Sequence, residues 1–312
     1  MYPNLNSPSI SLEADSWDLV QLKSQPPVII IGMHRAGTSL LTRILGQFGV
    51  FTGSRKTRNQ ESIWMNKINY WLFNQSSSTW ERPEGMDNLL AQPEICKVIE
   101  DYIQGIISGP ACTGYLGASK WIKYRSMFNI SRPWGWKDPR NTYTLPIWLR
   151  IFPDASIIHI KRHGVDVAQS LRVRQQRASA EAAARYRKKR RLYNNNPFAP
   201  KRSGFAHSPK VAKLEQGVEL WRSYTKRASE HVQALGDRAM EIYYEDLLMD
   251  PLKYLTRVFD FCGLEIPKDE LRENLGEISP ERAYAYQNNP ELVEVAEKFS
   301  DCLAEFGYYK DS

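Results

Sequence analysis

Residues 26–45 read PPVIIIGMHRAGTSLLTRIL, and this stretch decides the fold. The four β-branched residues of segment 28–31 are typical of a parallel strand that is buried on both faces. Gly32 ends this strand, and apolar residues then recur at helical spacing, at Leu40, Leu41, Ile44 and Leu45. A strand, a glycine-containing loop and a helix in this order form the opening of a βαβ unit.

The same alternation continues along the chain. Short β-type runs at 134–136, 156–160 and 240–243 each precede a helical pattern, beginning near 143, 164 and 251. Further helices are expected at 59–74, 94–108, 214–234 and within 269–312, and a loop is expected at 76–88. This order predicts an α/β fold, a P-loop-like single domain in which helices flank a central parallel sheet. Ligands of such sheets bind at the carboxyl ends of the strands.

The chain divides by composition into a tail, a domain and an insertion. Residues 1–25 are polar and contain prolines, so we expect an N-terminal tail without a signal peptide. The domain is predicted at 26–312. Within it, residues 172–213 are poor in apolar side chains and rich in Arg, Lys, Asn and Pro. This composition predicts a basic mobile insertion.

The net charge of +7 is concentrated in one segment, 172–191, which holds nine Lys or Arg and one acid. Nucleic-acid binders are usually basic over a whole face, so no nucleic-acid partner is expected. No apolar run is long enough to span a membrane, and a cytoplasmic location is expected. The four cysteines do not have metal-ligand spacing, so we expect no metal requirement.

Residues 32–39 have the outline of a phosphate-binding loop, G-x-x-x-x-G followed by two hydroxyl residues. Such a loop turns its backbone N–H groups inward, and the helix that follows adds the positive end of its dipole. A nucleotide-hydrolysing loop carries Lys after the second glycine. Here that position is Thr38 and the cation is Arg35, whose guanidinium is always charged and can bridge a phosphate and a sulfuryl group without a metal.

The segment Arg35-Ala36-Gly37-Thr38-Ser39 after a hydrophobic strand resembles the 5′-phosphosulfate loop of sulfotransferases that use 3′-phosphoadenosine 5′-phosphosulfate (PAPS). The resemblance implies transfer of a sulfuryl group from PAPS to a hydroxyl or amine acceptor, with release of 3′,5′-ADP. It also implies that the donor is held by Arg35, Ala36, Gly37, Thr38, Ser39 and Leu40.

A second anion site is predicted after the strand at 156–160. Arg162 follows this strand, Ser170 lies eight residues later, and Arg174 shares a helix face with Ser170 by i, i+4 spacing. Two guanidinium groups and a hydroxyl can converge on one phosphate. The spacing is similar to the family's Arg-x7-Ser motif for the 3′-phosphate, and Arg174 is similar to an extra arginine of the tyrosylprotein branch. The alternative is an ordinary strand–helix connection with solvated basic residues.

Sulfuryl transfer needs a base, cations at the breaking bond and in-line positioning. The resemblance implies Arg35 and Lys137 as the cations, the latter in a Lys-Asp-Pro segment like that of tyrosylprotein sulfotransferases. It implies Glu61 as the base, with His34 as the rival, because cytosolic members use histidine. Tyr244, in a Tyr-Glu-Asp-Leu segment, is implied to contact the nucleotide.

The Arg-Lys-Gly signature of cytosolic members is absent, which favours the bacterial and tyrosylprotein-like branch. Two other functions stay open: a P-loop nucleotide kinase or NTPase, and a non-enzymatic binder of nucleic acid or an anionic surface through 172–191. The run 185–191 is either a solvated excursion or a clamp for an acidic acceptor, and peripheral membrane contact is a further alternative. The sequence leaves open the oligomeric state and the acceptor class, which includes glycans, lipids, peptides, small phenols and alcohols.

Overall fold

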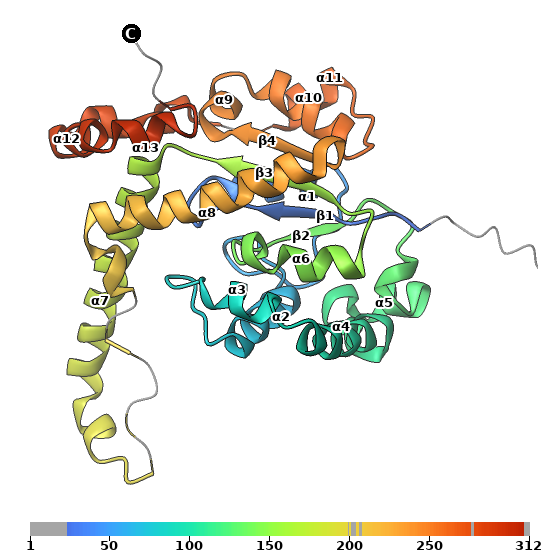
Figure 1. Ribbon diagram of the computed structural model, residues 1–312, viewed down its shortest axis with the longest axis horizontal. Helices are drawn as coiled ribbons and strands as arrows, with labels where there is room; N and C mark the ends of the chain where they lie inside the picture. Colours follow the sequence, from blue (N-terminus) through green and yellow to red (C-terminus); the bar gives the residue numbers. More distant parts are fainter. Residues whose placement is uncertain (1–23, 199, 201–203, 206–207, 276–277, 309–312) are drawn as a thin grey trace, which may run out of the picture.

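The computed structural model describes residues 24–198, 200, 204–205, 208–275 and 278–308. Its centre is one sheet of four parallel strands (Figure 1). In sheet order these are β2 (Gly135–Lys137), β1 (Val28–Ile31), β3 (Ser156–Lys161) and β4 (Ala239–Tyr243). The predicted α/β fold with a central parallel sheet is confirmed.

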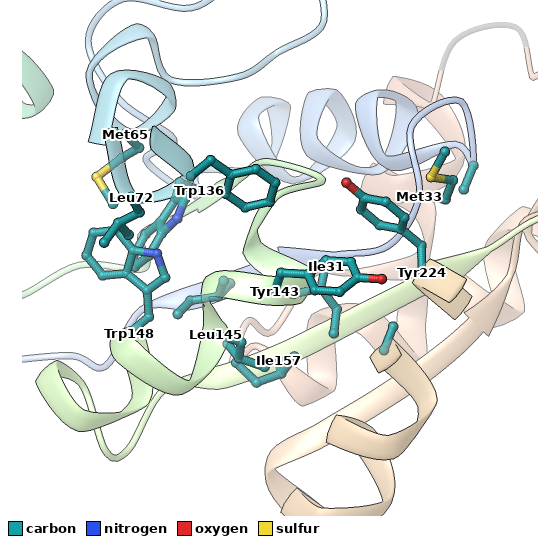
Figure 2. Close-up of a cluster of buried hydrophobic side chains, with 14 of the residues drawn as sticks. Ile31, Met33, Met65, Leu72, Trp136, Tyr143, Leu145, Trp148, Ile157 and Tyr224 are labelled. Carbon is teal, nitrogen blue, oxygen red and sulfur yellow. The ribbon is translucent and has the colours of Figure 1, made fainter. Parts of the chain in front are cut away.

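Helices cover both faces of this sheet, because alternate residues of each strand point to opposite sides. Ile29 and Ile31 of β1 face a core formed with α2 (Ile63–Gln75), α6 (Asn141–Ile151) and α8 (Leu214–Leu235). Figure 2 shows part of this core, in which Ile31 and Ile157 lie beside side chains from these three helices, Leu72, Leu145, Trp148 and Tyr224.

The opposite face of the sheet is covered by a smaller set of helices. Val28 and Ile30 pack there with α1 (Thr38–Gln47), α9 (Tyr244–Met249) and α10 (Pro251–Phe261). The remaining α-helices also add buried side chains to these cores. The first core includes residues of α3 (Gly85–Leu90), α4 (Pro93–Ser108), α5 (Thr113–Tyr124), α7 (Gly164–Asn194), α12 (Pro290–Lys298) and α13 (Ser300–Ala304), and the second includes Leu271 of α11 (Lys268–Asn274).

The segments that follow β1, β2 and β3 all leave the sheet at the carboxyl ends of its strands. The three strands are parallel neighbours, with Ile30 of β1 paired to Lys137 of β2 and to Ile158 of β3. The carboxyl ends of parallel neighbouring strands lie side by side. The predicted anion loop, Lys137 and Arg162 therefore begin at adjacent positions.

The predicted insertion 172–213 begins inside α7, which continues to Asn194 across a kink at Lys189. Five alanines between 178 and 184 favour a helix, and the first proline after the helix begins is Pro197. The helix runs away from the sheet, so the exposed basic run 185–191 lies far from the strands (Figure 1). The mobility of 172–213 and the domain boundaries stay predictions.

Two smaller differences concern the helical segments. The expected loop 76–88 ends early, because α3 begins at Gly85, and α5 was not predicted. The predicted tail lies almost wholly outside the described residues; of its last two residues, Gln25 donates its N–H to the carbonyl of Ile130.

Candidate active site

The loop after β1 adopts backbone conformations that explain its glycines. Gly37 has φ of 96°, and a Cβ there would lie 2.2 Å from the Tyr244 ring. Arg35, between the glycines, also has positive φ, 73°. Helix α1 then starts at Thr38 without a side-chain cap. The amides of Leu40 and Leu41 donate to the Gly37 carbonyl, which leaves the amides of Thr38 and Ser39 for an anion.

Arg35 connects this loop to α7. Its Nε donates a hydrogen bond of 2.7 Å to the hydroxyl of Ser170. Burial lowers the pKa of Arg35, and the charges of Arg162 and Arg282 lower it further. Several cations therefore crowd around one point in the structure, an arrangement that a bound anion relieves.

Lys137, at the end of β2, forms a buried ion pair with Glu61. Its Nζ lies 3.0 Å from Glu61 Oε1, and the two residues are 3% and 8% exposed. The same Nζ donates to the Asn59 carbonyl at 3.0 Å, which also accepts from the Ser39 hydroxyl at 2.9 Å. The second Glu61 oxygen accepts from Asn66 at 3.1 Å. A carboxylate and an ammonium are thus fixed beside the anion loop.

Arg162, after β3, lies on the other side of the loop. Its guanidinium stacks over the Tyr244 ring at 5.0 Å, and Nη2 donates to the carbonyl of Arg282 at 3.2 Å. Asp166, one helical turn later, lies 3.5 Å from the same nitrogen. Arg282 comes from the short 3-10 helix Pro280–Arg282, and no motif in the sequence marks it.

A third group surrounds Trp80, which the sequence reading did not single out. The His34 ring meets the indole edge to face at 4.8 Å, and the Arg174 guanidinium lies over the indole at 4.9 Å. Burial holds the pKa of His34 well below 6.5, and the charges of Arg174 and Lys137 add to the effect. His34 is therefore a neutral imidazole and a weak base at neutral pH.

Most of these groups line one cleft. The cleft brings together most of the predicted site residues, namely His34, Arg35, Gly37, Thr38, Ser39, Leu40, Glu61, Lys137, Arg162, Arg174 and Tyr244. Ala36 is buried beneath the loop, and Ser170 reaches the site through Arg35. Asn59, Pro139 and Arg282 also line the cleft and were not predicted.

Comparison with protein families decides the assignment. The model of the family described as "Sulfotransferase family" matches residues 26–268, which is most of the chain. The chain belongs to the sulfotransferase family. Sulfuryl transfer is therefore its reaction class, and the predicted family is confirmed. Arg282 lies beyond the matched range.

Solved structures with a similar fold include a sulfotransferase from Alicyclobacillus acidocaldarius, at 16% identity and a TM-score of 0.48, covering 93% of this chain and 98% of that chain. A sulfotransferase domain of the Synechococcus PCC 7002 olefin synthase has 18% identity and a TM-score of 0.45, with 89% and 95% covered. A sulfotransferase domain from the curacin biosynthetic pathway has 14% identity and a TM-score of 0.46, with 89% and 98% covered.

No curated protein matches the chain at a significant level. Among the described residues, no three His, Cys, Asp or Glu side chains are grouped so that they could hold a metal ion. No helix in the described part of this sulfotransferase combines the length and apolar character needed to cross a bilayer.

Proposed function

We propose that this sulfotransferase uses PAPS as its donor, transfers the sulfuryl group to a hydroxyl or amine, and releases 3′,5′-ADP. The observation that carries the proposal is the 2.7 Å contact between Arg35 and Ser170. It joins the loop suited to a 5′-phosphosulfate to the helix that follows Arg162. A donor with phosphates on both the 3′ and the 5′ positions of its ribose needs two such anion sites within one cleft.

At the donor end of the cleft, we assign the 5′-phosphosulfate to the loop and the 3′-phosphate to Arg162, Ser170 and Arg282. The first two amides of α1 face the first anion, and Arg35 supplies the charge. Arg162 and Arg282 supply the paired guanidinium groups that favour a phosphate dianion. Tyr244, packed between Gly37 and Arg162, is placed to contact the nucleotide.

At the reacting end, we assign Glu61 as the base and Lys137 as a cation. The acceptor oxygen forms a bond to sulfur while the bond from sulfur to the bridging phosphate oxygen breaks. The acceptor proton passes to Glu61, and Arg35 and Lys137 stabilise the negative charge left on the departing phosphate. The buried pair of 3.0 Å supports this because it holds the base and the cation at one place. The weakly basic His34 remains the rival base.

Calorimetric binding of 3′,5′-ADP tests the donor. In the presence of EDTA, the wild-type protein should bind it, and Arg35→Ala should weaken binding about 10- to 100-fold, as expected for loss of a charge-assisted contact. Arg43→Ala, which removes an exposed arginine from α1, is the matched control and should leave binding unchanged.

Two outcomes would contradict the proposal. Equal binding of 3′,5′-ADP by wild type and Arg35→Ala would remove the loop from the donor site. Magnesium-dependent binding of ATP or GTP without binding of 3′,5′-ADP would instead favour a nucleotide kinase or NTPase. The acceptor class stays open, and transfer from labelled PAPS to a panel of phenols, alcohols and amines identifies it. The cytoplasmic location stays a prediction.

A further inference from the structure

Arg174 occupies a different part of the cleft from Arg162. Its guanidinium lies over the indole of Trp80, on the side of the anion loop where His34, Glu61 and Lys137 are found. Burial lowers the pKa of Arg174, the charge of Arg35 lowers it further, and Glu61 and Glu81 oppose this shift. Arg174 lines the same cleft as Glu61, Lys137 and His34, so it lies near the proposed base.

Arg174 also lacks the acidic partner that a half-buried arginine usually has. No carboxylate among the described residues lies within ion-pair distance of it, and its Nε is buried without a hydrogen-bond partner. Arg172, on the same helix, forms two hydrogen bonds to Glu291, at 2.5 and 2.8 Å. Because removing an unpaired charge from water is costly, an unpaired guanidinium in a cleft favours an anionic ligand.

The surroundings of Arg174 are suited to holding such a ligand. The indole of Trp80 supports the flat face of the guanidinium, which leaves its N–H edge for a ligand in the cleft. On the same indole, the buried Nε2 of His34 also lacks a partner among the described residues. In the same cleft as the Glu61–Lys137 pair, the Arg174 guanidinium therefore lacks an ion-pair partner and the His34 Nε2 lacks a hydrogen-bond partner among the described residues.

We propose that Arg174, with Trp80 and His34, forms a subsite for an anionic group on the acceptor, so that the acceptor carries a carboxylate or phosphate on the same molecule as its reacting hydroxyl. The inference rests on the proposed function, which supplies the donor's own sites around Arg35 and Arg162. It gives Arg174 a role different from the one that its spacing from Ser170 predicts, which is to bind the 3′-phosphate.

The test uses pairs of acceptors that differ in charge at one group. The pairs are 4-hydroxyphenylacetate and 4-hydroxyphenylacetamide, 6-hydroxyhexanoate and its amide, and glucose 1-phosphate and methyl glucoside. Each compound is titrated into protein saturated with 3′,5′-ADP, and kcat/KM for transfer from PAPS is measured for each. The variants are Arg174→Gln and Arg174→Lys, with Arg177→Gln as the control that removes an exposed charge from the same helix.

The wild-type protein should prefer the anionic member of at least one pair by about 10- to 100-fold, in both Kd and kcat/KM. Arg174→Gln should abolish this preference while 3′,5′-ADP binding is unchanged, Arg174→Lys should retain part of it, and Arg177→Gln should behave as wild type. The pair that shows the preference distinguishes a carboxylate from a phosphate.

Three results would overturn the inference. The first is that no anionic compound of the panel binds the 3′,5′-ADP complex more tightly than its neutral partner. The second is a preference that survives Arg174→Gln. The third is a loss of 3′,5′-ADP binding in Arg174→Gln, which would assign Arg174 to the donor. Failure of the proposed function is distinguishable, because then the wild-type protein does not bind 3′,5′-ADP and the inference falls with it.

Discussion

The two ends of the cleft are built in different ways. At the donor end, the anion loop and Arg162 follow directly from adjacent strands, and Arg35 and Arg162 each have a partner within the protein. At the acceptor end, Lys137 comes from a strand, but Glu61, Trp80 and Arg174 come from helices and loops distant in sequence. In the proposed assignment, the strand ends thus position the first donor contacts, Arg35 and Arg162, whereas the acceptor contacts depend more on helices and loops that pack beside the sheet.

The charges at the two ends differ as well. At the donor end, guanidinium groups gather, and among the described residues their one ion pair is the 3.5 Å contact between Arg162 and Asp166, so positive charge predominates there. At the acceptor end, Glu61 neutralises Lys137, and Arg174 is left unpaired among the described residues. The difference predicts that substitutions at the acceptor end alter turnover, while those at the donor end alter nucleotide affinity.

The largest effect should follow Glu61→Gln, which keeps the shape of the side chain and removes the base. We expect kcat to fall by about 10²- to 10⁴-fold, the usual contribution of a general base, with 3′,5′-ADP binding unchanged. Steady-state transfer assays and calorimetry measure the two quantities. A larger fall in His34→Gln than in Glu61→Gln would transfer the role of base to His34.

Lys137→Met should lower kcat by about 10²- to 10³-fold, as loss of one charge-stabilising group typically does. Nucleotide affinity should not change, and Lys67→Met, at an exposed position on α2, is the matched control. Because Lys137→Met leaves Glu61 buried without its partner, the double variant with Glu61→Gln checks whether any loss of stability or nucleotide binding comes from the unpaired carboxylate. A properly folded single variant that loses nucleotide binding would place Lys137 at the donor end.

The donor end contains an acid whose titration should affect stability. Glu245 is 1% exposed and accepts a hydrogen bond from the His163 amide, and burial raises its pKa to about 7 from 4.5. The folded protein therefore holds a proton that the unfolded chain releases between these values. Stability should fall as the pH rises from about 4.5 through 7, by up to about 3 kcal/mol.

Glu245→Gln should remove this pH dependence, because the amide cannot titrate. Urea unfolding at pH 5 and pH 8 measures the free energy of unfolding for both proteins. If the wild type and the variant lose the same stability between these pH values, another group is responsible and Glu245 is not protonated in the folded protein at pH 5.

A smaller effect separates backbone strain from packing at the anion loop. Gly37 and Gly49 both have φ of 96°, but a Cβ at Gly37 would collide with Tyr244, whereas at Gly49 nothing lies within 4 Å. Gly37→Ala should therefore destabilise the protein by about 1–3 kcal/mol more than Gly49→Ala, and it alone should weaken 3′,5′-ADP binding. Equal effects in denaturant unfolding and calorimetry would show that Tyr244 does not constrain the loop.

The sequence singles out most residues of the proposed donor end because they belong to short local segments. A β-branched run, a glycine loop and a hydroxyl pair lie within 28–39, and Arg162 and Ser170 are separated by one helical segment. Alternating strands and helices predict the parallel sheet, and the observed position of β3 beside β1 brings Ser170 close to Arg35. The roles of the individual residues at both ends stay predictions.

The sequence does not predict the parts that depend on tertiary contacts. Trp80 lies in an expected loop, and its importance comes only from packing with His34 and Arg174. Arg282 reaches the cleft from a short helix without any motif. The helix through the basic run after Arg174 was not predicted. The low apolar content of 172–213 indicated an insertion, although the alanines between 178 and 184 favour a helix.

Discrimination between 3′,5′-ADP and 5′-AMP tests the central claim most directly, because these ligands differ only in the 3′-phosphate. The wild-type protein should prefer 3′,5′-ADP by at least about 10- to 100-fold, the value of charge-assisted contacts to one phosphate. Arg162→Ala and Arg282→Ala should each reduce this preference, and Lys137→Met should retain it. A wild-type protein that binds both nucleotides equally, or a preference that survives Arg162→Ala and Arg282→Ala together, would contradict the assignment of this end of the cleft to the donor.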